Sequence, residues 1–360
     1  MNRRNQIKMG GVFGAASAFL KGRPKVSAAL LGMALFCSVV GVKRSLGDDD
    51  GGSIAEEAHH AGTSVAAIEK FWAVYHGNDY DDIPAVQAEL ERALRHDPNN
   101  FTLYALLGAT HFWHVGEYKR DPKPDPNVLR QDMPTAASLF QKAYELDYYG
   151  HHLIGHINDD HLPGYWGITT FHTGQQFMDP SLMAKGDKIL DYAVYQFPEF
   201  NNFNRWAAHN TDPRDSETYK KALDSLWEGI DSCIEGSIDR ANPDLKPYLH
   251  LYTRVGRKKA CWWGGDLAPY SFEGYLLNLG DGLVKAGEVE AAKVIFADAQ
   301  YADNYATWPY RDVLEAIAGS DLNARAALYA DGNSSNEPPL GVPNRSCVYC
   351  HATVPEPAAR

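Results

Sequence analysis

Residues 276–299 read LLNLGDGLVKAGEVEAAKVIFADA. Apolar residues recur there at three- and four-residue spacing on both sides of Gly287, as they do along the buried faces of two short helices. Gly280 and Ala292 are small enough to let two antiparallel helices approach closely, and Phe296 is large enough to fill a groove beside a neighbouring pair. Since one such pair cannot bury its apolar face alone, the stretch predicts a helix pair that stacks on others.

Earlier parts of the chain repeat this arrangement, with an interruption. The matching positions are Tyr104, Leu107, Gly108 and His111 in a first helix, and Ala136, Phe140 and Ala143 in a second. An insert that contains DPKPDPNVLRQD, residues 121–132, separates the two helices. A preceding pair is expected to end near Asp97-Pro98.

The positions Leu279-Gly280, Gly287, Ala292, Phe296 and Ala299 have the spacing of a tetratricopeptide repeat, and the chain resembles that family. The resemblance implies an all-α fold, a short right-handed stack of antiparallel helix pairs, and protein–protein binding through the repeats. An unrelated helical array with the same packing needs is the alternative.

Helical periodicity covers most of residues 54–330, which are expected to form one helical domain without strands. The predicted helices are 54–76, 84–96, 102–116, 134–147, 182–197, 215–237, 273–286 and 288–302. Residues 150–270 depart from the repeat pattern because they are rich in aromatic residues, glycine and proline. We therefore expect an irregular central region there.

The N-terminus has the layout of an export signal. Residues 1–25 are basic and contain no acidic residue, and residues 26–42, VSAALLGMALFCSVVGV, are apolar and uncharged. A basic flank before an apolar run is typical of a signal peptide or a signal anchor. Residues 43–53 read as an acidic linker. We expect one apolar N-terminal helix to hold the domain at the periplasmic side of the inner membrane; a cleaved signal peptide is the alternative.

Composition excludes two classes of protein. With 44% hydrophobic residues, 12% aromatic residues and 20 tyrosines, the chain can bury a core and is not disordered. A formal net charge of -12 argues against nucleic acid as a partner, because nucleic-acid binding needs clustered lysine and arginine.

The C-terminal arm, residues 331–360, carries Cys347-Val348-Tyr349-Cys350-His351 after a proline- and glycine-rich stretch. The spacing resembles the attachment site of c-type cytochromes, in which two thiols bond to the haem vinyl groups and the next histidine binds the iron. The resemblance implies haem c held covalently by Cys347 and Cys350, with His351 as the proximal ligand. Only nine residues follow His351, so the haem must pack on the helical domain, another subunit or a partner.

Two other chemistries fit a Cys-x-x-Cys pair. A zinc site needs four ligands, so histidines from elsewhere would have to complete it. A dithiol redox pair of the thioredoxin type would need a strand–helix setting, which the sequence lacks. The isolated Cys233 and Cys261 are read as small buried residues or, in an exported domain, as a disulfide.

The second metal ligand is left open by the sequence. Residues 151–172 read HHLIGHINDDHLPGYWGITTFH and hold five of the 14 histidines. His152, His156 and His161 are candidates for a distal haem ligand or a second metal site, and Met178 is a candidate sulfur ligand. A solvated loop before Pro163-Gly164 is the other interpretation.

These features together predict an exported c-type haem protein that transfers electrons to a redox protein partner docked on the helical array. The alternative is an envelope scaffold whose Cys/His tail is a metal-binding or structural element. An enzyme that uses the histidine-rich centre ranks below both, because no catalytic group of residues can be assembled from spacing alone.

Overall fold

The computed structural model describes residues 53–154, 161–234, 236–248, 268–331, 335–342 and 348–352, and for residues 53–61 and 148–154 it describes the backbone alone. Within these ranges the protein contains twelve α-helices and a few short 3-10 turns, with no strand. The predicted all-α fold is therefore confirmed for the described part of the chain.

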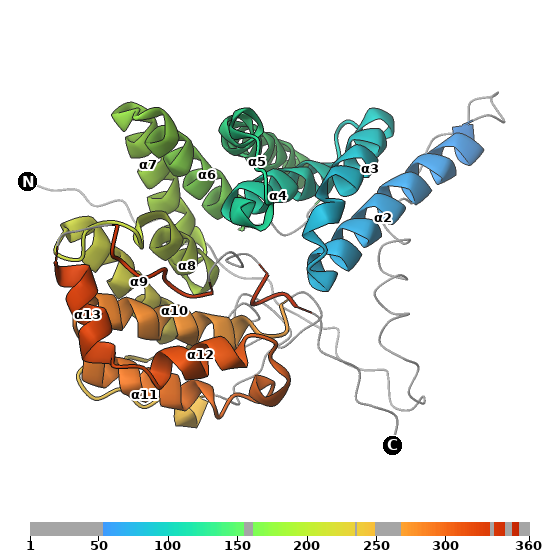
Figure 1. The fold of residues 1–360 in the computed structure, drawn as a ribbon. Helices are drawn as coiled ribbons and strands as arrows, with labels where there is room; N and C mark the ends of the chain where they lie inside the picture. The colour runs from blue at the N-terminus through green and yellow to red at the C-terminus, as the bar shows by residue number, and fades with distance from the viewer. Residues whose placement is uncertain are drawn as a thin grey trace, which may run out of the picture. The chain divides into compact units, whose positions relative to one another are not determined.

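The helices follow one another as neighbours in space (Figure 1). They are α2 (Ser53–Gly77), α3 (Ile83–His96), α4 (Phe101–Gly116), α5 (Pro126–Ile154), α6 (Leu162–Phe177), α7 (Pro180–Gln196), α8 (Pro198–His209), α9 (Glu217–Ile234), α10 (Ser271–Ala286), α11 (Val289–Ala299), α12 (Arg311–Ala318) and α13 (Leu322–Ala330). Most connections are a few residues long, so consecutive helices form antiparallel pairs.

The pair predicted from residues 276–299 is present as α10 and α11. Gly287 ends α10 with a φ of 90°, a left-handed conformation that favours glycine. A Cβ added at Gly280 would lie 2.4 Å from the ring of Phe296. The two helices therefore approach closely because residue 280 has no side chain.

Helices α4 and α5 repeat the same contact. A Cβ at Gly108 would lie 3.3 Å from the ring of Phe140, which also stacks on Tyr165 of α6 at 5.2 Å between ring centroids. Phe140 thus joins its own pair to the next. Because α5 begins at Pro126, half of the 121–132 insert extends the second helix rather than forming a loop.

Residues 162–234, within the region expected to be irregular, form four regular helices, α6 to α9. Helices α7 and α9 match the predictions at 182–197 and 215–237, whereas α6 and α8 correct the expectation. Pro163 and Pro198 lie in the first turns of α6 and α8, where proline needs no amide partner and helps a helix begin. Gly167 lies against Leu190, and Gly186 lies against the backbone of Phe171. Glycines in this region are thus contact points between helices rather than breaks.

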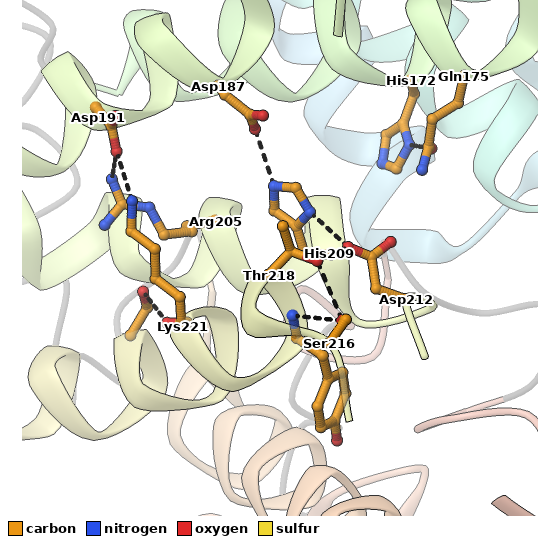
Figure 2. Close-up of polar contacts among 12 residues, drawn as sticks. His172, Gln175, Asp187, Asp191, Arg205, His209, Asp212, Ser216, Thr218 and Lys221 are labelled. Carbon is orange, nitrogen blue, oxygen red and sulfur yellow. Dashed lines mark hydrogen bonds and ion pairs between the residues drawn. The ribbon is translucent and has the colours of Figure 1, made fainter. Parts of the chain in front are cut away.

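A buried imidazole ties α7, α8 and the turn before α9 together (Figure 2). The His209 Nε2 lies 2.9 Å from a carboxylate oxygen of Asp187, and its Nδ1 lies 2.9 Å from one of Asp212. The Thr218 hydroxyl donates to the same Asp212 oxygen. Burial alone would lower the pKa of His209, but the hydrogen bonds and charges of the two aspartates outweigh it and raise the pKa to about 9.

This arrangement predicts a specific loss of stability at alkaline pH. The folded-state pKa of His209 lies above the ordinary 6.5, so its contribution is complete below about pH 6.5 and disappears as the pH rises through 9. Urea unfolding at pH 6.5 and pH 9.5 should show a loss of up to about 3 kcal/mol in the wild type. The His209→Gln variant lacks the titration of this histidine but keeps the other titratable groups. If the unfolding free energy depended on pH equally in both proteins, the raised pKa of His209 would be contradicted.

Among the described residues, no helix is both long enough and apolar enough to cross a membrane. The apolar segment at residues 26–42, with its basic flank and acidic linker, lies outside the described ranges except for Ser53.

Candidate functional site

The described part of the Cys-x-x-Cys-His motif forms one turn of helix. The amide of His351 donates to the carbonyl oxygen of Val348 at 3.0 Å, and the amide of Ala352 donates to the same oxygen at 2.9 Å. Cys347 lies outside the described residues. The described turn begins at Val348, so it fixes the positions of Cys350 and His351 relative to each other.

The two residues between the cysteines belong to the protein core. Val348 is fully buried in the cluster formed by α2, α3 and α4, next to Phe71 and Trp113. Tyr349 is buried in a different cluster, which α9 to α13 share. The motif is therefore packed against both groups of helices rather than carried on a free tail.

Polar contacts fix the orientation of this turn. The Trp308 indole N–H donates to the carbonyl oxygen of Tyr349 at 2.9 Å, and the amide of Tyr270 donates to that of Cys350 at 3.0 Å. The Tyr349 hydroxyl bonds the amide group of Asn278, whose Oδ1 accepts from the Trp206 indole at 3.2 Å. Buried polar groups linked in this way specify one arrangement of the segment.

A glycine in α10 makes room for the motif. A Cβ built on Gly274 would lie 2.3 Å from the Cys350 Sγ and 2.7 Å from the Tyr349 ring. The sulfur thus occupies the notch that the missing side chain leaves. Any larger residue at position 274 would push the turn away from α10.

The surroundings of Cys350 keep its thiol neutral. Cys350 is not disulfide-bonded, and burial together with the nearby Glu273 carboxylate raises the pKa of its thiol. Glu273 is itself 2% exposed, and burial raises its pKa to about 7. Zinc binding and disulfide exchange both use the thiolate, so Cys350 would have to lose its proton before either reaction.

The imidazole of His351 lies beside an aromatic group on the N-terminal helices. Its ring centroid is 5.0 Å from that of Tyr75 in α2, which in turn is 5.0 Å from that of Trp113 in α4. His351 is half-buried. The thiol of Cys350 and the imidazole of His351 are two of the three groups that a c-type haem site uses. The thiol lies against Gly274 of α10, and the imidazole lies against Tyr75 of α2.

The other predicted ligands are not brought together with the motif in the described structure. His161 precedes α6, where its ring packs edge-on against Phe197 and Phe200 at centroid distances of 5.0 and 4.3 Å. Met178 is 87% exposed in the left-handed turn that ends α6. The side chain of His152 and all of His156 lie outside what the structure describes.

The sequence did not single out the paired histidines of α4. The Nδ1 atoms of His111 and His114 lie 2.7 and 2.5 Å from the two oxygens of the buried Asp132 in α5. Burial alone would raise the pKa of Asp132, but these two hydrogen bonds outweigh it and lower the pKa. The spacing of three residues between these histidines, which places both on one face of a helix, was the signal in the sequence that could have identified the pair. Within the described residues, no group of three or more His, Cys, Asp or Glu is arranged to hold a metal ion.

Cys233 in α9 is disulfide-bonded. Its partner lies outside the described residues, as does Cys261, the cysteine with which the sequence analysis paired it.

No protein-family model matches this chain, and comparisons with curated proteins and with solved structures found none similar to it.

Proposed function

We propose that the protein is an exported c-type haem protein that transfers electrons to a protein partner docked on its helical domain. The observation that carries the proposal is the docked turn at residues 348–352, which holds the Cys350 thiol beside α10 and the His351 imidazole beside Tyr75. Cys347 and Cys350 would hold the haem, and His351 would bind its iron.

The haem supplies the one-electron redox chemistry, and the protein supplies ligation, position and exclusion of water. Tyr349 and Val348 fix the turn in the core, while Trp308 and Tyr270 hold its main-chain carbonyls. Tyr75 limits the directions from which solvent reaches the His351 ring. These residues would keep the His351 imidazole in one orientation.

A tetratricopeptide-like arrangement of the helix pairs would support a docking role. The contacts of Gly108 with Phe140 and of Gly280 with Phe296 are the close helix–helix contacts that a tetratricopeptide-like array predicts. Such stacks present extended surfaces to partner proteins. An acidic chain with a net charge of -12 would favour a basic redox partner.

Export is the remaining part of the proposal. The basic and apolar N-terminal segments resemble a signal anchor, and a disulfide at Cys233 fits an oxidising compartment. Attachment of haem c outside the cytoplasm agrees with both features.

Expression with and without a cytochrome c maturation system tests the proposal. The matured protein should show a haem absorption spectrum and should stain for haem on a denaturing gel, whereas the protein made without maturation should do neither. A folded, matured sample without colour would exclude the redox role. Bound zinc in a colourless sample would instead favour the envelope scaffold.

A further inference from the structure

The first described part of the C-terminal arm, residues 335–342, lies in a set of specific contacts with α10 and α13. The Tyr329 hydroxyl donates to the carbonyl oxygen of Pro338 at 3.0 Å, and the Arg325 guanidinium donates to that of Pro339 at 2.8 Å. The amide of Gly341 donates to the Asp281 carboxylate at 2.9 Å. Three side chains thus bind main-chain atoms of the segment.

The binding groups also contact residues outside the segment. Asp281 is fully buried and pairs with Arg325 through two hydrogen bonds of 2.9 Å each. Lys285 is 1% exposed, lies over the rings of Tyr219 and Tyr329, and donates to the carbonyl oxygen of Asn210 at 3.0 Å. A preorganised site loses little entropy on binding.

Residues 337–342 combine a charge, two prolines, a glycine and an apolar side chain that a binding site can recognise. Glu337 supplies a charge for Lys285, and two prolines fix the backbone so that consecutive carbonyls face Tyr329 and Arg325. Val342 is buried in the core, and Gly341 has a φ of 64°, which other residues rarely adopt. Donors that bind proline carbonyls beside aromatic rings are a general mode of proline-rich recognition.

We propose that α10 and α13 form a binding site for a proline-rich segment of a partner protein, and that residues 337–342 occupy this site in cis. The ligand would carry an acidic residue, two prolines, an apolar residue and a glycine, in that order. The inference deepens the partner docking in the proposed function by naming the partner's chemistry, but it does not depend on haem.

Fluorescence anisotropy on the full-length, haem-free protein tests the site, with a labelled peptide of sequence NEPPLGV, residues 336–342. Gly341→Val should displace the arm in cis because a branched residue is strained at positive φ, and this variant should bind the peptide. The wild type should bind at least about ten-fold more weakly, because its own arm competes. Glu337→Lys, which alters the arm but neither helix, provides a second background if Gly341→Val does not fold.

Tyr329→Phe in the same background removes one hydroxyl and should weaken peptide binding about three- to ten-fold, the range for one hydrogen bond. Tyr195→Phe, at an 82% exposed tyrosine of α7, is the matched control and should have no effect. The proposal is overturned if the folded arm variants do not bind the peptide, or bind a peptide with valine in place of glycine equally well. A wild-type dimer that dissociates in Gly341→Val would assign the contacts to arm exchange and also overturn it.

Discussion

Replacing Cys350 with serine should remove covalent haem from the matured protein. The serine hydroxyl does not form the thioether that joins haem to a c-type site, so haem staining on a denaturing gel should fall below about a tenth of the wild-type level. The smaller oxygen should still fit beside Gly274, where the sulfur now lies. Burial of the hydroxyl should lower the free energy of unfolding by about 1–3 kcal/mol, so urea unfolding of the variant checks that it is folded and separates attachment from folding.

Met178→Leu is the matched control for this experiment. Met178 is 87% exposed, so the variant should fold and retain full haem staining. Its visible spectrum also tests the sulfur as a distal ligand, since an unchanged spectrum would eliminate that candidate. Unchanged haem staining in Cys350→Ser would contradict the assignment of this cysteine.

Helix positions were predictable from the sequence where apolar periodicity is strong. The boundary at Gly287 and the close contact of Gly280 with Phe296 follow from residue size and from the left-handed conformation that glycine allows. Helix α6 was not predicted because a mostly buried helix lacks a polar face, and α8 was not predicted because its polar residues Asn201, Asn202 and Asn204 are buried. Both helices have a proline in the first turn. Proline ends a helix or begins one according to position, and only the neighbouring packing decides which.

The spacing of the motif predicts a haem-binding role for Cys350 and His351, and this role stays a prediction. The spacing did not predict where the motif lies in the fold. The docking of the motif depends on Gly274, Asn278 and Trp308, which lie 41 to 76 residues before the motif residues they contact. No sequence motif marks these three residues. Long-range contacts of this kind require the tertiary structure.

The largest expected effect on stability is that of Gly274→Ala. An added methyl group would lie 2.3 Å from the Cys350 sulfur and 2.7 Å from the Tyr349 ring, so the turn must leave α10. Overpacking and the partial loss of Tyr349 and Val348 burial should together lower the unfolding free energy by about 3 kcal/mol. Chemical denaturation measures this change, and faster alkylation of Cys350 in the native, haem-free protein would show that the turn has moved.

Gly62→Ala in α2 makes the same substitution where nothing lies within 4 Å of the added Cβ. Alanine favours helix over glycine by about 0.5–1 kcal/mol, so this control should be slightly more stable than the wild type and should leave the Cys350 alkylation rate unchanged. The two substitutions should change the free energy of unfolding in opposite directions. This difference separates the effect of filling the notch at Gly274 from a general effect of replacing glycine. If Gly274→Ala matched Gly62→Ala in both measurements, the turn would not be docked on α10, and the haem site would lose the support that the helical domain gives it.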